Sequence, residues 1–272
     1  MKTAEIDVEF IDSMGDDKRV VESARVSFNA KDEEYSEARC ESLISFLARG
    51  IMSKEYNRIL SDMADEDDLE CIKALVQQLD KEKHFAPFTH CMLTFKITAP
   101  LFLARQLWKS HIGGHMSEPV LGEGWSEVSR RYVDDEPEFY VPKDYRNKAE
   151  NVKQGSSDQN VDGILYISTD ELGDVHGTAE DAVTHALQCS LGIYQGLLSA
   201  GVCAEQARIV LPQNMMTSWV WTGSLLFFTR ICKLRLDAHA QKENKDVALP
   251  IYNKLLELFP LSTNALLGNI NE

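Results

Sequence analysis

"CMLTFKITAPLFLARQLWKS", residues 91–110, sets the structural class of this chain. Apolar and polar side chains alternate up to Thr98, so Leu93, Phe95 and Ile97 share one face, as in a half-buried strand. Proline tolerates the first position of a helix, and the stretch that starts at Pro100 is therefore predicted to be helical. The segment predicts a strand that passes directly into a helix.

Working outward, most of the remaining chain predicts helices. Thr178 and Asp181 have the spacing of a capping box, and Gly50 and Gly201 mark helix ends. Helices are predicted over 16–26, 35–48, 54–82 (one or two, acidic), from Thr178 to Gly201, and over 219–259 with a kink at Pro250. Short extended segments are expected at 125–133 and 138–141, a loop at 111–124 and a polar connection at 146–163. The pattern favours an α+β fold, a helix-rich single domain with a small, mostly antiparallel sheet.

Composition limits the classes of function. The chain has 272 residues, 44% of them hydrophobic, and a net charge of −15 from 43 acidic and 28 basic residues. So acidic a surface repels nucleic acids and anionic membranes. No signal segment and no apolar run of about 20 residues are apparent. Six cysteines without a CxxC pair predict buried free thiols in a reducing compartment, so we expect a cytoplasmic protein.

The positions of the basic residues are the most informative feature. Several of them interrupt apolar helical stretches: Arg105, Lys109, Arg208, Arg230 and Arg235. Each alone is explained by a side chain that reaches to water. Together with Arg130 and Arg131 they are equally well explained by a shared anionic ligand, because guanidinium groups match phosphate geometry. Both interpretations stay open at this level.

Three other kinds of site are disfavoured. His111 and His115 have the spacing of two metal ligands, but Gly113 and Gly114 lie between them and a third ligand is not obvious, so no metal is expected. The nearest stretch to a dinucleotide-binding motif, "GEGWSE" at 122–127, lacks the third glycine, and a P-loop is absent.

The segment "GWSEVSRRYV", residues 124–133, offers a nucleophile or an anion site. On a strand, Glu127 and Ser129 would share a face, as a base and a nucleophile must. However, two following arginines would keep the glutamate anionic and weaken it as a base. Ser129 beside Arg130 and Arg131 is therefore predicted to bind phosphate.

The segments at 91–110 and 124–133, together with further blocks of the sequence, resemble the flavin-dependent thymidylate synthases. "ARQLWKSHIGG" and "WSEVSRRYV" are similar to that family's signature, in which RQ-x-x-RHR is followed by NE-x-S-x-RY. Further blocks agree in order: "ARVSF" (24–28), "HFAPFTHCMLTFKITAPLFLARQ" (84–106), "EFYVP" (138–142), "ARIVLP" (207–212) and "LRLDAHAQKE" (234–243). They span nearly the whole chain, which we therefore expect to be one catalytic domain.

The resemblance implies an enzyme that converts dUMP to dTMP with FAD, NADPH and methylenetetrahydrofolate, without an enzyme nucleophile. It also implies a homotetramer whose active sites are shared between subunits. Arg235 would polarise the pyrimidine and favour its N3-ionised form. The implied dUMP ligands are Gln106, Lys109, Glu127, Ser129, Arg130, Arg131, Arg208 and Arg235, and the implied FAD ligands are Lys109, Ser110, His111, Glu127, Ser224 and Arg230.

The chain departs from the family pattern at several positions. The RHR triplet is replaced by Lys109, Ser110 and His111, and Ser126 stands before Glu127 where asparagine is usual. A lysine keeps the charge but lacks the guanidinium fork, which bears on flavin binding. Insertions are expected near 54–82, 114–124 and 147–165. Two alternatives remain: a relative that transfers another one-carbon group to a pyrimidine nucleotide, and a non-catalytic nucleotide-binding protein.

Overall fold

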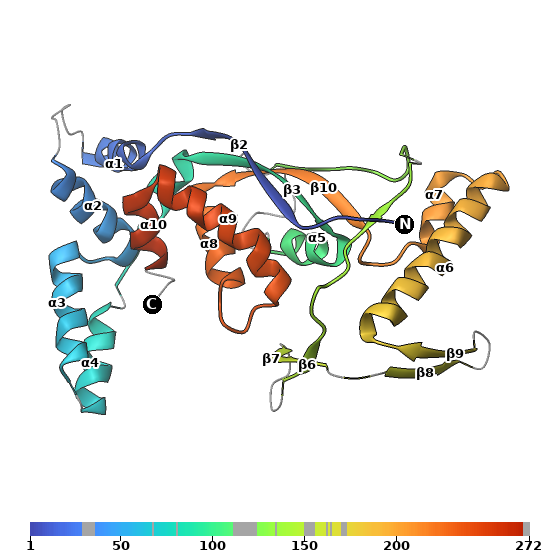
Figure 1. Cartoon of the computed structure of the whole chain (residues 1–272). Coiled ribbons are helices and arrows are strands. Elements are labelled where there is room, and N and C mark those ends of the chain that lie inside the picture. The colour runs from blue at the N-terminus through green and yellow to red at the C-terminus, as the bar shows by residue number, and fades with distance from the viewer. Residues whose placement is uncertain are drawn as a thin grey trace.

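The computed structural model describes residues 1–28, 36–66, 68–79, 81–110, 124–133, 135–149, 156–161, 163, 165–169 and 173–268. Their centre is a four-stranded antiparallel sheet with the strand order β2-β3-β10-β4 (Figure 1). The strands are β2 (Asp7–Met14), β3 (Met92–Pro100), β10 (Met216–Ser224) and β4 (Gly124–Glu127). The predicted α+β class is confirmed.

The strand-to-helix prediction for residues 91–110 is confirmed, with one shift at proline. Leu93, Phe95 and Ile97 are buried on one face of β3, as the alternation predicts. Pro100 ends the strand with an extended backbone and is the N-cap of α5 (Leu101–Trp108), not its first residue. Helix α5 therefore begins directly at the end of a central strand of the sheet.

The prediction that residues 219–259 are helical throughout is wrong at its start and again at 236–241, where the chain forms bends and turns. Residues up to Ser224 belong to β10, where Trp219 and Trp221 are buried and Val220 between them is exposed. Tryptophan, valine and threonine favour strands, and their period-two alternation fits a sheet position between β3 and β4. Ser224 then caps α8 (Leu225–Arg235), since its side chain accepts a hydrogen bond from the Phe227 backbone.

Helices from both ends of the chain pack around the main core. They are α1 (Asp17–Arg25), α2 (Glu37–Arg49), η2 (Ala86–His90), α8, α9 (Lys242–Leu258) and α10 (Pro260–Leu267). The 3₁₀ helix η1 (Val26–Phe28) follows α1, and its Val26 is exposed. The helix ends predicted near 16–26 and at Gly50 are confirmed. Pro250 lies inside α9, which continues past it to Leu258.

A second core forms around α6 (Ala179–Ser199). Thr178 and Asp181 make the predicted capping box at its start, and Leu187, Leu191 and Tyr194 are buried on one face. The helix packs with α7 (Ala204–Ala207) and η3 (Arg208–Val210), and with Phe139 of β5 (Glu138–Phe139), which pairs in parallel with β1 (Lys2–Thr3). This second core positions Arg208 near the end of β4.

The segments that were predicted as insertions form small units of their own. Residues 54–82 contain two helices, α3 (Ser53–Ala64) and α4 (Leu69–Leu79), which project away from the sheet (Figure 1). The polar connection at 146–163 is not plain coil, because β6 (Arg146–Lys148) pairs with β7 (Ser156–Asn160). A second hairpin follows, of β8 (Leu165–Thr169) and β9 (Gly173–Gly177). Most of 111–124 lies outside the described residues, except Gly124.

All six cysteines are free thiols, as predicted, but they are not all buried. Cys91 and Cys232 are buried and Cys40 is half-buried, whereas Cys71, Cys189 and Cys203 are exposed. The assumption that every free cysteine lies in the core is therefore wrong. Within the described segments, no helix has both the length and the apolar character needed to span a membrane.

Candidate active site

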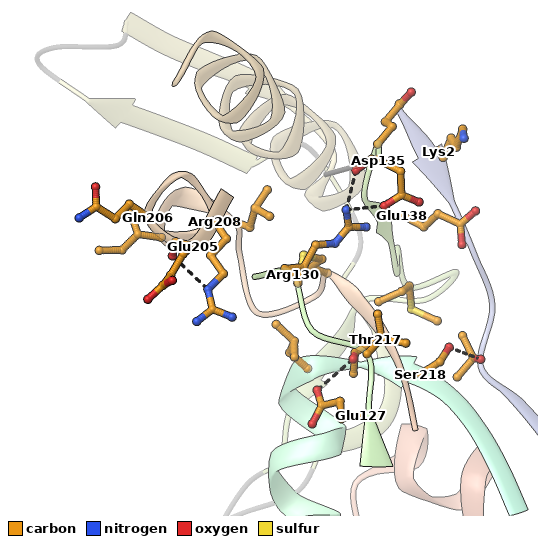
Figure 2. A pocket seen from close by; sticks show the side chains of 18 residues that line it. Lys2, Glu127, Arg130, Asp135, Glu138, Glu205, Gln206, Arg208, Thr217 and Ser218 are labelled. Carbon is orange, nitrogen blue, oxygen red and sulfur yellow. Dashed lines mark hydrogen bonds and ion pairs between the residues drawn. The ribbon is translucent and has the colours of Figure 1, made fainter. Parts of the chain in front are cut away.

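A first cleft of about 850 Å³ opens where β4 ends and β10 begins, opposite α7 and η3. Figure 2 shows Arg130 and Arg208 entering it from different elements, with Glu127 below them. Its polar lining also includes Lys2, Glu205, Thr217 and Ser218. Three of the residues predicted to bind dUMP therefore line one cleft, although Arg208 is far from the other two in the sequence.

Glu127 is held in a fixed orientation at the end of β4. Its Oε1 accepts from Thr217 Oγ1 at 2.9 Å, and its Oε2 accepts from Trp125 Nε1 at 3.2 Å. Trp125 is itself stacked on Trp219, with ring centroids 4.5 Å apart. Two neutral donors thus orient this carboxylate without neutralising its charge. The role of Thr217 was not predicted from the sequence, because the contact joins two different strands.

The two adjacent arginines point to different partners. Arg131 Nε donates to Ser129 Oγ at 3.1 Å, whereas the side chain of Arg130, 13% exposed, pairs with Asp135 Oδ1 at 2.9 Å. Both follow the end of β4, since the chain turns at residues 130–132. The prediction of an extended segment through Val133 is therefore wrong, and so is the shared strand face of Glu127 and Ser129. Ser129 has an arginine beside it and no carboxylate base among the described residues.

A second cleft, of about 950 Å³, lies between the end of α8, the start of α9 and the β6–β7 hairpin. Four cationic side chains line it, those of Arg146, Arg230, Lys233 and Arg235, against one acidic side chain. Gln106 of α5 and Gln241 also line it. An acidic protein has thus gathered positive charge in one hollow, which favours an anionic ligand.

The guanidinium of Arg235 makes hydrogen bonds through Nη2, whereas its Nε makes none among the described residues. Its Nη2 donates to the Gln106 backbone carbonyl at 3.0 Å and to Ser110 Oγ at 2.7 Å. Its Nε is buried and has no hydrogen-bond partner among the described residues. Burial lowers the pKa of this guanidinium, which nevertheless stays charged because arginine titrates so high. A buried donor without a partner is costly and fits an acceptor that a ligand supplies.

Gln106 is fixed by two other amides. Its Nε2 donates to Gln241 Oε1, and its Oε1 accepts from Asn244 Nδ2, both at 2.7 Å. Glu243, between them in sequence, is buried and pairs with Arg146 Nη2 at 3.0 Å. The sequence did not single out Gln241, although it lies in the quoted block at 234–243, and the contacts of Asn244 and Arg146 arise only in the fold.

The remaining predicted ligands are scattered. Lys109 is exposed at the end of α5, and Ser110 is buried against Arg235. Ser224 caps α8, which gives its hydroxyl a structural role, and Arg230 lines the second cleft. His111 and His115 lie outside the described residues. In the segments that are described, no three histidine, cysteine or acidic side chains are grouped as metal ligands.

Comparison with known proteins identifies the family to which these features belong. A family model described as thymidylate synthase complementing protein matches residues 9–261. The chain belongs to this family. The resemblance to the flavin-dependent thymidylate synthases that the sequence indicates is confirmed, and so is the prediction of an enzyme of this kind.

Individual relatives agree along most of their length. A flavin-dependent thymidylate synthase of Thermosipho africanus is 29% identical over 257 residues, which cover 94% of this chain and 89% of the relative. The enzyme of the same name from Thermus thermophilus is 29% identical over 255 residues, covering 94% of this chain and 73% of the relative. Among solved structures, a UMP/dUMP methylase from Streptomyces cacaoi bound with 5-Br dUMP has a TM-score of 0.67 at 24% identity, covering 97% of this chain and 96% of the other. That similarity establishes a shared fold.

Proposed function

We propose that this chain methylates dUMP to dTMP, as a flavin-dependent thymidylate synthase with methylenetetrahydrofolate as carbon donor and NADPH as reductant. Family membership supports the reaction class. The observation that carries the proposal to this chain is Arg235, a half-buried cation at the wall of a basic cleft, whose buried Nε has no hydrogen-bond partner among the described residues. A fixed cation beside a uracil ring stabilises the N3-ionised form, which makes C5 more nucleophilic.

The two clefts suit different parts of the nucleotide. Arg130 and Arg208 in the first cleft, with Ser129 and Arg131 beside it, offer charged and neutral donors to a phosphate. Gln106 and Arg235 in the second offer donors to the carbonyl oxygens of a pyrimidine. Glu127, oriented by Thr217, is an acceptor for a ligand N–H or hydroxyl group.

We further propose that the complete site forms between subunits of a homotetramer. Within one chain, five of the eight predicted dUMP ligands are divided between the two clefts and the other three line neither, which supports a site that a second copy completes. The rim of the first cleft supports it too, because Ile209 is 85% exposed and Val128 52% exposed. Apolar side chains so exposed beside a polar cleft are typical of a surface that another chain covers.

FAD fits the groups that are present. Its diphosphate and its ring carbonyls are acceptors, and Arg230, Lys109 and the Nε of Arg235, which lacks a partner among the described residues, are donors suited to them. Lys109, Ser110, Glu127, Ser224 and Arg230 are the described residues we expect to hold it, and we expect the same of His111. When bound, FAD supplies hydride-transfer chemistry that no side chain offers.

The chain's own residues then bind, orient and polarise the substrate, without a nucleophile of their own. Ser129 has no carboxylate base beside it in the described part of the chain. Cys91 is an unsuitable nucleophile, because burial, with Asp16 and Asp17 nearby, raises the pKa of its thiol to about 11. Burial also raises the pKa of Cys232. All six thiols are free, which fits the cytoplasm that we propose as its location.

The proposal is tested by an assay of dTMP formation from dUMP that omits FAD, NADPH and methylenetetrahydrofolate in turn. Turnover that needs all three supports it. Formation of a pyrimidine nucleotide that carries another one-carbon group would favour the alternative of a relative that transfers such a group. Purified protein that binds dUMP but neither takes up FAD nor forms dTMP would leave a nucleotide-binding protein.

A further inference from the structure

The amide of Asn244 lies behind the second cleft, where the proposed reaction does not use it. This side chain is fully buried, at 0% exposure, in the first turn of α9, and it is not part of the cleft lining. Its Nδ2 donates to Gln106 Oε1 at 2.7 Å. The Oδ1 of Asn244 is buried without a partner among the described residues, so the Nδ2 contact is the side-chain hydrogen bond that holds this amide there.

That contact determines which way Gln106 faces. A primary amide has an acceptor side and a donor side. Because Asn244 donates to it, Gln106 turns its oxygen toward Asn244 and its NH₂ group toward Gln241, whose Oε1 accepts at 2.7 Å. Gln241 must then hold its own oxygen inward. The N–H groups of Gln241, and the second N–H of Gln106, are left for the cleft that both residues line.

The neighbouring charges reinforce this arrangement. Glu243 is engaged by Arg146 Nη2 at 3.0 and 3.1 Å, so its carboxylate does not accept from the three amides. Arg235, on the same cleft wall, adds a buried Nε without a partner among the described residues. The wall therefore presents donors to whatever occupies the cleft.

We propose that Asn244 is a positioning residue for dUMP. Asn244, Gln106 and Gln241 are linked by two hydrogen bonds, and Asn244 sets their direction. The wall of the second cleft then offers N–H groups to the acceptor edge of the pyrimidine. That edge consists of carbonyl oxygens and, in the ionised form, of N3. This inference rests on the proposed function, because it takes dUMP as the ligand of the second cleft.

Two substitutions of Asn244 separate the effect of hydrogen-bond direction from the effect of side-chain packing. Asn244→Leu keeps the branched shape with somewhat larger end groups and removes the donor, whereas Asn244→Asp keeps the shape and, when ionised, only accepts. The aspartate must accept from the NH₂ group of Gln106, which reverses the direction of the hydrogen bonds from residue 244 to Gln106 and from Gln106 to Gln241. The control is Thr263→Val, which removes the hydrogen bond from Thr263 Oγ1 to the Leu255 carbonyl at 3.0 Å, a fully buried contact away from both cleft linings.

The readouts are the Kd for dUMP by calorimetry, the KM and kcat for dUMP, and the unfolding temperature, with binding measured well below that temperature. We expect Kd and KM to rise about tenfold in Asn244→Leu and further in Asn244→Asp, with kcat changed less. Thr263→Val should lose a similar amount of stability and keep the wild-type Kd.

Two results would overturn the inference while the proposed function stands: wild-type affinity for dUMP in both Asn244 variants, or wild-type affinity in Asn244→Asp alone. The first would make Asn244 a packing residue only, and the second would show that hydrogen-bond direction does not matter. Wild-type protein that does not bind dUMP would instead refute the proposed function, and this inference with it.

Discussion

Arg235 Nη2 lies 2.7 Å from Ser110 Oγ, which joins the last residue of α8 to the end of α5. Ser110 is the middle residue of the Lys-Ser-His triplet that replaces the usual RHR triplet, and it is 3% exposed. A neutral hydroxyl in this place orients the guanidinium without adding charge. Arg235, which is predicted to polarise dUMP, is thereby hydrogen-bonded to Ser110, which is predicted to contact FAD.

Replacing Arg235 with alanine should abolish measurable dTMP formation, a loss of about 100- to 1000-fold or more, because a preorganised cation that stabilises developing charge contributes that much. Arg235→Lys should recover part of the activity, since it keeps the charge without the fork. Circular dichroism and dUMP-dependent turnover are the measurements. Retained turnover in a folded Arg235→Ala protein would contradict the assigned role.

Ser110→Ala should have a smaller effect than Arg235→Ala. Arg235 Nη2 keeps its bond to the Gln106 carbonyl at 3.0 Å, so the guanidinium is loosened and not lost. We expect kcat to fall about tenfold, which corresponds to one lost hydrogen bond to a charged group. A kcat equal to that of the wild type would show that Ser110 does not orient Arg235.

Asp135→Asn should tighten dUMP binding. Asp135 is 71% exposed and pairs with the much less exposed Arg130 at 2.9 Å, so its carboxylate competes with a phosphate for that guanidinium. We expect the KM for dUMP to fall about two- to fivefold at low salt and the difference to shrink as salt is added. Glu70→Gln, which breaks an exposed pair with Lys73, is the control. An increased KM in Asp135→Asn would mean that Asp135 instead orients Arg130 for the ligand.

The stability of the chain should depend on the ionisation of Asp17. Its carboxylate caps α10 by accepting from the Leu261 and Ser262 backbone N–H groups at 2.7 and 2.9 Å, yet burial raises its pKa above the usual value. Because the pKa of Asp17 is higher in the folded state than in the unfolded state, its contribution to the free energy of unfolding is fully present below the unfolded-state pKa. That contribution is lost as the pH rises through the folded-state pKa. Asp17→Asn should therefore flatten the dependence of the unfolding free energy on pH in that range. Equal slopes in urea unfolding of the two proteins would contradict this.

Asp17→Ala serves as the comparison for that measurement. It removes both acceptors and leaves two backbone N–H groups at the start of α10 unsatisfied, so we expect a loss of about 1 kcal/mol at neutral pH. Asparagine keeps one acceptor oxygen and should lose less.

The thiols should differ sharply in reactivity. Cys71 is exposed on α4, whereas Cys91 is buried with a pKa of about 11, and Cys232 is buried with a raised pKa. Since the thiolate is the reactive form, iodoacetamide at about pH 8 should modify Cys71 in the native protein and reach the two buried thiols only after unfolding. Peptide mass spectrometry gives the modified sites. Equal rates at Cys71 and Cys91 would contradict the burial of Cys91.

Local patterns were sufficient for much of the fold. The alternation at Leu93, Phe95 and Ile97, the capping box at Thr178 and the helix end at Gly50 depend on neighbouring residues and were predicted correctly. Local reasoning failed at β10 and α8, where the apolar residues of the strand run on into the helix and no proline marks the junction as Pro100 does between β3 and α5. An apolar run alone does not distinguish a buried strand from a helix.

The sequence by itself determined the residue types and their order: the family signature, the basic residues within apolar segments and the lack of a base suited to Ser129. Only the tertiary structure decided how these residues group. It divided five of the eight predicted dUMP ligands between two clefts, turned Arg130 to Asp135 and Arg131 to Ser129, and set Asn244 against Gln106 across 138 positions of sequence. Hydrogen-bond partners so far apart are fixed by how the sheet and helices pack, which no local pattern encodes.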